Sequence, residues 1–210
     1  MIHHVSRVLV CLAVLSAAPA AYASQVEVGD LVRFKSSTGT LGGGAFVVDD
    51  VTDPTVADFL SFCVQVTQYI NYSDNFRVAG ITDYADDAAG NDAVGSETTW
   101  IMSNFSRGLL GAYTSNDIQW AIWQLEGEKG TSWGNSAALI GLAQAAVAGG
   151  WANDGVKVLN LFYANGTKAQ DQLVYLPEEL TVSEVPEPGT LALVGGGVIA
   201  AVVARRRRRS

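Results

Sequence analysis

The spacing of hydrophobic positions predicts strands on both sides of a helical middle. Strand patterns occur at residues 26–34, 45–48, 62–67, Val156–Tyr163 and 172–176. These segments are short, rich in valine and aromatic residues, and separated by turn signals such as the glycine-rich stretch 39–44. Within residues 62–67, Phe62, Val64 and Val66 share one face and Cys63 lies on the other. We therefore expect Cys63 to point away from the most apolar stripe, because successive side chains of a strand alternate between its faces.

Three helices are predicted between these strands. In residues 118–126 four apolar positions recur at helical spacing, namely Ile118, Ala121, Ile122 and Leu125. Ser115, Asn116 and Asp117 are N-cap candidates for this helix, and Gly127 is its stop. The other two helices begin after Ser96 and span residues 137–148. This order predicts an α+β domain, a mostly antiparallel β sandwich or barrel with a helical insertion.

An acidic stretch follows the first group of strands. Residues 83–95 are rich in glycine and alanine and contain Asp83, Asp86, Asp87, Asn91 and Asp92. Calcium is conceivable there, but the spacing does not fit an EF-hand loop. We predict a solvated loop and assign no metal site and no cofactor.

The N-terminus has the three parts of a secretory signal peptide. Arg7 supplies the positive charge, residues 8–17 form an apolar run, and Ala21-Tyr22-Ala23 is a cleavage site of small residues. The signal peptide therefore spans residues 1–23, and the mature chain is expected to begin near Ser24.

The C-terminus carries a second targeting segment. Pro186-Glu187-Pro188 precedes an apolar stretch at residues 190–204 and the arginine run 205–209. The apolar stretch is short of the ~20 residues that cross a bilayer comfortably, so it suits a transient anchor, although an ordinary single-pass tail anchor is the alternative. Because the arginines stay on the cytoplasmic side, the preceding domain lies outside the membrane.

This C-terminal pattern, residues 184–210, resembles the PEP-CTERM sorting signal. The resemblance implies that an exosortase, a membrane-embedded cysteine transpeptidase, cuts near Pro186-Glu187-Pro188 and releases the domain. The expected location is the cell surface, the outer envelope or an extracellular matrix, after transient anchoring in the inner membrane. The signal is an address and says nothing of the activity of residues 24–183.

Removing both targeting segments leaves a strongly acidic domain. Residues 24–183 hold seven basic and 19 acidic residues, a net charge of about −12. Nucleic acid and anionic lipid are unfavourable partners for such a surface.

The same removal isolates one cysteine. His3, His4 and Cys11 all leave with the signal peptide, so residues 24–183 contain no histidine and only Cys63. Catalysis by an imidazole base, histidine-ligated zinc and an internal disulfide are therefore excluded from this domain. Cys63 is either buried and inert, paired between molecules, or bonded to something other than sulfur.

Two motifs favour the last of these possibilities over a buried, inert Cys63 with Gln119 as an ordinary polar residue on its helix. Phe62-Cys63-Val64 and Ile118-Gln119-Trp120-Ala121-Ile122-Trp123 together resemble the thioester domains of bacterial surface adhesins. The resemblance covers most of the domain and implies an internal thioester between Cys63 and Gln119. Trp120 and Trp123 are candidate shields of that bond. The known members are displayed mainly by Gram-positive organisms through a different wall-sorting signal, which puts a host target in doubt. Matrix polymer, a neighbouring cell and another surface protein are targets that fit at least as well.

Such a bond is a stored electrophile. An amine of a partner, with a lysine ε-amino group as the expected one, would attack the Gln119 carbonyl, leaving an amide and a free Cys63 thiol, whereas a hydroxyl would give an ester. Gln119 near the start of its helix would place its carbonyl close to unpaired backbone N–H groups, which stabilise an oxyanion. The reaction is used once and does not turn over, so the protein is not expected to be an enzyme.

Two rival functions remain open. One is non-covalent binding of matrix or carbohydrate, with Trp133, Trp151 and Tyr163 as stacking surfaces. The other is glycoside cleavage by Glu126 and Glu128, which neighbouring turn positions support only weakly.

Overall fold

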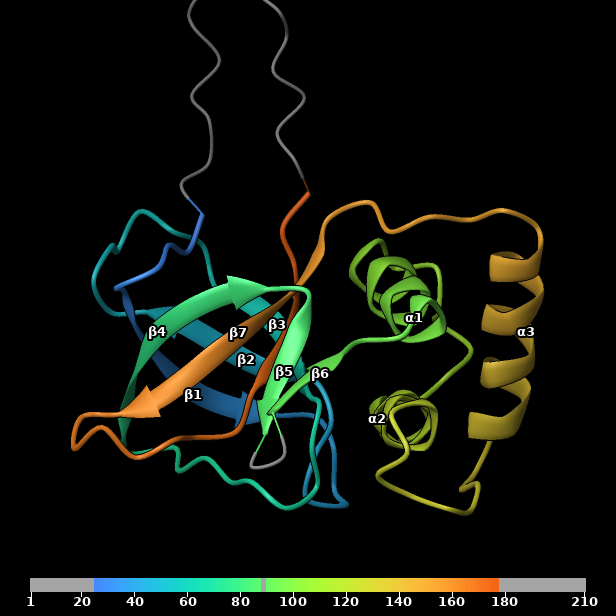
Figure 1. The fold of residues 1–210 in the computed structure, drawn as a ribbon, viewed down its shortest axis with the longest axis horizontal. Coiled ribbons are helices and arrows are strands. Elements are labelled where there is room, and N and C mark those ends of the chain that lie inside the picture. The colour runs from blue at the N-terminus through green and yellow to red at the C-terminus, as the bar shows by residue number, and fades with distance from the viewer. Residues whose placement is uncertain (1–24, 88–89, 178–210) are drawn as a thin grey trace, which may run out of the picture.

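A computed structural model describes residues 25–87 and 90–177. Its centre is a closed six-stranded antiparallel barrel in the order β1-β2-β3-β8-β7-β4 (Figure 1). The barrel strands are β1 (Leu31–Ser37), β2 (Phe46–Asp50), β3 (Phe59–Cys63), β4 (Asn75–Thr82), β7 (Val156–Tyr163) and β8 (Gln172–Tyr175). The expectation of an α+β fold with a mostly antiparallel sheet is confirmed.

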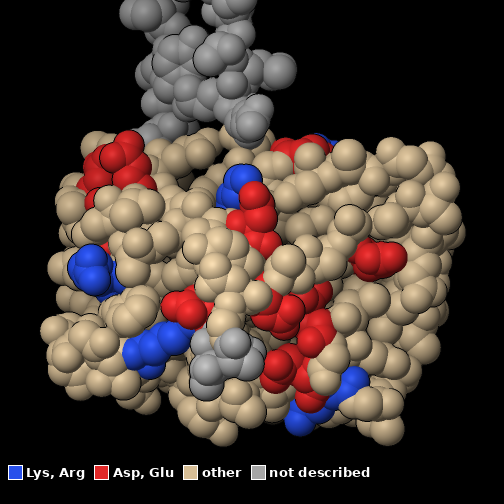
Figure 2. All heavy atoms as spheres, viewed as in Figure 1, with Lys and Arg blue, Asp and Glu red and all other residues tan. Residues whose placement is uncertain are grey.

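The acidic stretch is not the open loop that the sequence predicts. It forms a short hairpin of β5 (Tyr84–Asp87) and β6 (Gly90–Ala93) beside the barrel. Asp171 fixes it there, because its Oδ2 accepts a hydrogen bond of 2.7 Å from the backbone N–H of Asp86. Acidic side chains gather around this hairpin on the face shown in Figure 2. The described residues contain no cluster of His, Cys, Asp or Glu able to hold a metal ion.

Three helices cover one side of the barrel (Figure 1). They are α1 (Ser96–Ser106), α2 (Ser115–Leu125) and α3 (Ser136–Ala148). α2 begins with a capping box in which the Thr114 hydroxyl accepts from the backbone N–H of Asp117, and the Asp117 carboxylate accepts from that of Thr114. Thr114 is therefore the N-cap, one residue before the predicted candidates, and Asp117 contributes from within the helix.

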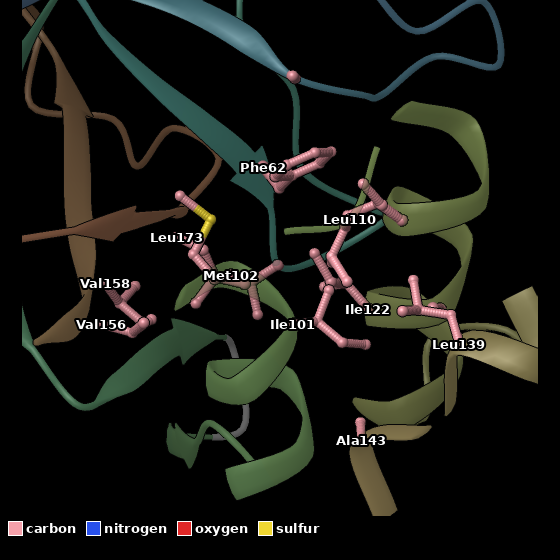
Figure 3. Packing of buried hydrophobic residues seen from close by; sticks show 14 of the residues in the cluster. Phe62, Ile101, Met102, Leu110, Ile122, Leu139, Ala143, Val156, Val158 and Leu173 are labelled. Carbon is pink, nitrogen blue, oxygen red and sulfur yellow. The ribbon is translucent and has the colours of Figure 1, made fainter. Parts of the chain in front are cut away.

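The helices bury the outer faces of three barrel strands. Phe62 of β3 and Leu173 of β8 point toward Met102 of α1 (Figure 3), and the Phe62 ring packs edge-on against Phe105 at 4.9 Å. The next residue in each strand faces the barrel interior, as Cys63 does in β3. These strands are buried on both faces, which explains the nearly continuous apolar sequence of β7.

Several boundaries differ from the predicted ones. β1 begins only at Leu31, because Gly29 adopts a left-handed conformation with φ of +107° that interrupts the extended chain. β3 ends at Cys63, since the backbone N–H of Val66 bonds to the Glu128 carboxylate at 2.8 Å and not to a strand. β4 was not predicted, because only Phe76 and Val78 alternate clearly within it.

The two ends of the described domain lie side by side. The side-chain amide of Gln25 donates to the carbonyl of Pro177 at 3.3 Å. The signal peptide (1–23), the segment 184–210 and its Pro186-Glu187-Pro188 motif lie outside the described residues. Among the described helices, none is long and apolar enough to span a membrane.

Glu126 links α2 to α1 and gives the fold a testable pH dependence. Its carboxylate accepts from the Thr98 hydroxyl and from the backbone N–H of Gly95. Burial nevertheless raises the Glu126 pKa above its ordinary value. The fold therefore favours protonated Glu126, and this stability is lost as pH rises through the raised pKa. Because glutamine keeps an acceptor oxygen without the charge, Glu126→Gln should become more stable relative to wild type as pH rises from about 4.

Urea unfolding of both chains between acidic and neutral pH measures this difference. Subtracting the wild-type curve removes the contributions of the other carboxylates, which both chains share. A difference that stays constant with pH would contradict the assignment.

Candidate functional site

The carboxamide of Gln119 is held against the main chain of Cys63. Gln119 Oε1 accepts two backbone N–H hydrogen bonds, from Cys63 and from Gly44, each 3.1 Å long. Gln119 Nε2 donates to the carbonyl of Cys63 at 2.8 Å. Both residues are buried. The two motif residues, 56 positions apart in the sequence, therefore meet.

The donors to this carbonyl oxygen are not those expected from the sequence. Gln119 is the fifth residue of α2, beyond the first turn in which helix N–H groups are unpaired. The donors come instead from the end of β3 and from the loop before β2. Two N–H groups converging on one carbonyl oxygen polarise it, which is the arrangement of an oxyanion hole.

Gly43 lies directly on the Gln119 carboxamide. A Cβ atom at Gly43 would come within 2.7 Å of Gln119 Cγ and 2.9 Å of Cδ. The adjacent Gly44 has φ of +117°, a conformation that side chains other than glycine rarely adopt. The glycine-rich segment therefore brings backbone to a place where no side chain fits.

The loop between β1 and β2, residues 38–45, is fastened to the start of α2. The Thr38 and Ser115 hydroxyls lie 2.5 Å apart. Asn116 accepts from the backbone N–H of Thr40 at 2.9 Å and donates to its hydroxyl at 2.8 Å. Ser115 and Asn116, predicted as N-caps, thus fix this loop over Gln119.

The thiol of Cys63 lies in the apolar barrel interior. The alternation correctly predicts that it points away from Phe62, yet both faces of the strand are buried. Its Sγ donates to Gln170 Oε1 at 3.0 Å, and Gln170 Nε2 donates to the carbonyl of Gln65 at 2.7 Å. Burial raises the pKa of the Cys63 thiol to about 12. The thiol is therefore protonated at neutral pH.

A pocket of about 590 Å³ opens beside this buried pair. Its walls are residues 39–43, the segment 66–72, and the side chains of Trp120, Trp123 and Lys129. Gly43 and Gln170, which contact Gln119 and Cys63 respectively, also line it. The pair thus lies one layer behind the pocket surface.

The two tryptophans form one wall of the pocket. Their ring centres are 6.0 Å apart in an edge-to-face arrangement, and Trp123 is only 3% exposed. Trp120 donates from Nε1 to the carbonyl of Thr131 at 2.5 Å. Lys129 Nζ lies 5.7 Å from the Trp120 ring centre and 6.0 Å from that of Trp123, within cation–π range.

The residues of the two rival functions do not converge. Trp133 and Trp151 lie beyond opposite ends of α3, a helix of 13 residues and so about 20 Å long. Tyr163 packs on Phe76 with ring centres 4.9 Å apart. The three aromatic residues do not form a single stacking surface.

Glu126 and Glu128 serve separate structural contacts. Glu126 accepts from Thr98 and Gly95, whereas Glu128 accepts from the backbone N–H of Val66. Their carboxylates therefore do not face each other across a cleft, as glycoside cleavage would require.

Gly43, Gly44 and Gln170 belong to the site but were not singled out from the sequence. The three consecutive glycines at 42–44 were a signal, interpreted only as a turn. Gln170 had no signal, because its contact with the Cys63 thiol arises only when β8, which starts two residues later, returns beside β3.

Comparison with known proteins finds a match only for the C-terminal segment. Searches of curated proteins and of solved structures gave no significant match. Residues 184–209 match the family described as the PEP-CTERM protein-sorting motif. The resemblance of the domain to thioester domains stays a prediction. The chain therefore carries a PEP-CTERM motif, which implies that it is exported, sorted to the cell surface and processed by an exosortase.

Proposed function

We propose that Cys63 and Gln119 join in an internal thioester, and that the displayed domain uses it to capture amine groups of a partner covalently. The observation that carries the proposal is the position of the Gln119 carboxamide. Its oxygen accepts two backbone N–H groups, and its nitrogen donates to the residue that bears the thiol.

Thioester formation needs the Cys63 sulfur to reach the Gln119 Cδ atom. The carboxamide already lies against the main chain of Cys63, so the proposal requires Sγ to leave Gln170 and turn toward Gln119 by rotation about the Cα–Cβ bond of Cys63. The Sγ–Cδ bond forms, the Cδ–Nε2 bond breaks, and the thiol proton leaves on the nitrogen as ammonia. The N–H groups of Gly44 and Cys63 stabilise the oxygen of the tetrahedral intermediate.

Burial protects the product from water. Both motif residues are buried and belong to closely packed surroundings, so hydrolysis is slowed for lack of water at the carbonyl. The high pKa of the Cys63 thiol acts in the same direction. A sulfur that resists carrying negative charge leaves readily only when it receives a proton.

In capture, the Cys63 sulfur is the leaving group and an amine is the nucleophile. A partner's unprotonated amine attacks Gln119 Cδ, the Cδ–Sγ bond breaks, and the amine proton passes to the sulfur. An amide to the partner and a free Cys63 thiol result. The pocket is the approach, and Gly43, Gln170 and Trp123 separate it from the reacting atoms.

Incubation with methylamine tests this function. A domain carrying the thioester should gain methylamine at Gln119 and expose one thiol per adduct, as peptide mapping and thiol titration measure. Cys63→Ala should gain neither, because no thioester can form. Absence of adduct from a chain that has lost ammonia would show the bond to be structural and the capture function wrong.

A further inference from the structure

The pocket beside the Cys63–Gln119 pair has the size of a ligand site. Its volume of about 590 Å³ falls within the ~300–1,000 Å³ typical of sites for small molecules. Residues 66–72 and the β1–β2 loop form two of its walls.

Exposed aromatic rings border this pocket. Tyr69 is 72% exposed and Tyr72 49% exposed, and both line it together with Trp120. Because the three rings line one pocket, they form a continuous apolar surface of the kind that marks ligand-binding grooves. The face of an aromatic ring attracts groups with partial positive charge, such as the C–H groups of a sugar ring.

A residue that lines the pocket carries an unused hydrogen-bond acceptor. Gln68 lines it, and Gln68 Oε1 is buried with no partner among the described residues. The Nε2 of the same side chain makes a contact of 3.5 Å to the carbonyl of Asp86. A buried acceptor without a partner is costly, and a ligand hydroxyl or amine satisfies it once the Gln68 side chain turns this oxygen into the pocket.

The charge of the pocket is opposite to that of the domain. Lys129 is the one charged residue in its lining, although residues 24–183 carry a net charge of about −12. Lys129 has no ion pair with any carboxylate of the described residues, whereas Lys35, Lys157 and Lys168 do. This positive charge opposes the entry of a protonated ammonium group such as a lysine side chain.

We propose that the pocket recognises a polysaccharide containing amino sugars and delivers its free amine to Gln119. The amine of an amino sugar is less basic than that of lysine, because the neighbouring oxygen atoms withdraw electrons. More of it is uncharged and nucleophilic at neutral pH, and the charge of Lys129 favours that form. The C–H groups of the sugar ring would pack against the aromatic faces of Tyr69, Tyr72 and Trp120.

The covalent part of this inference rests on the proposed thioester, whereas recognition does not. The amine nitrogen attacks Gln119 Cδ, the bond to Sγ breaks, and the amine proton moves to the sulfur. The sugar is then joined to Gln119 by an amide.

Recognition is tested first in Cys63→Ala, which carries no thioester whether or not the wild type forms one. Titration with glucosamine oligosaccharides, followed by NMR, should shift signals of residues 66–72 and 119–129. Tyr72→Ala and Tyr69→Ala in that background should each weaken binding at least tenfold. Leu142→Ala, which removes a 49% exposed side chain on α3, is the matched control and should leave binding unchanged. Binding that is absent, or equal in all these variants, would overturn recognition by the pocket.

Selectivity is tested in the wild-type domain. Offered equal concentrations of a glucosamine oligosaccharide and a lysine-containing tripeptide at neutral pH, Gln119 should form the sugar adduct at least ten times faster. Lys129→Glu should shift this ratio toward the peptide. Methylamine labelling without sugar preference would overturn the inference and leave the proposed function standing. Sugar binding by Cys63→Ala with no ammonia loss in wild type would contradict the proposed function and the covalent step, and leave recognition by the pocket standing.

Discussion

Replacing Gly43 with alanine should slow formation of the proposed thioester about 100-fold or more, because a misplacement near 1 Å in a near-attack geometry has an effect of about that size. The added Cβ would lie 2.7 Å from Gln119 Cγ and 2.9 Å from its Cδ and Oε1. The carboxamide has to move away, and its oxygen then loses the N–H groups of Gly44 and Cys63. Mass spectrometry at successive times after expression measures the effect, as the fraction of domain molecules that have lost one ammonia.

Gly130→Ala is the matched control for this variant. A Cβ at Gly130 meets no atom within 4 Å, so its thioester content should equal that of wild type. A Gly43→Ala domain that folds and forms the thioester at the wild-type rate would contradict the arrangement of the site described above.

Replacing Asp171 with alanine should lower the free energy of unfolding by about 3–5 kcal/mol, since several buried donors lose their acceptor at once. The Asp171 carboxylate is fully buried and accepts from the backbone N–H groups of Asp86 and Leu161 at 2.7 and 3.2 Å. It also accepts from Asn160 at 3.1 Å and lies 3.5 Å from Lys168 Nζ. Asp171 follows Gln170, so its loss also loosens the residue that contacts the Cys63 thiol.

Asp171→Asn separates this hydrogen-bonding role from simple loss of volume. Asparagine keeps one acceptor oxygen and the shape of the side chain, so its loss of stability should be clearly smaller than that of alanine. Urea unfolding monitored by tryptophan fluorescence measures both variants. A loss below about 1 kcal/mol for Asp171→Ala, the net value of one ordinary hydrogen bond, would contradict the central position given to this carboxylate.

The hydrophobic pattern within a segment predicts those strands and helices whose boundaries do not depend on contacts with distant segments. β7 has the bounds that its apolar run predicts, because a strand buried on both faces has an almost uninterrupted hydrophobic sequence. The sequence does not predict β4, since its alternation covers only residues 75–78 before Gly80 interrupts it, and its full length comes from pairing with β7. Closure of the barrel by β1 and β4 leaves no trace in either strand's own sequence.

The candidate site was partly predictable for the same reason. Cys63 and Gln119 were found from two short motifs, and the structure places the Gln119 carboxamide on the main chain of Cys63. The donors on the Gln119 oxygen were predicted wrongly. Unpaired N–H groups at the start of a helix can be expected from sequence alone. The N–H of Gly44, by contrast, reaches Gln119 only because the β1–β2 loop folds onto α2.

The intact mass of the purified mature domain tests the central claim most directly. A domain that carries the thioester has a mass lower than that of its sequence by one ammonia molecule, and Cys63→Ala should show the full mass of its own sequence. A wild-type domain with its full unmodified mass, and with a Cys63 thiol that reacts readily in the native fold, would contradict the thioester.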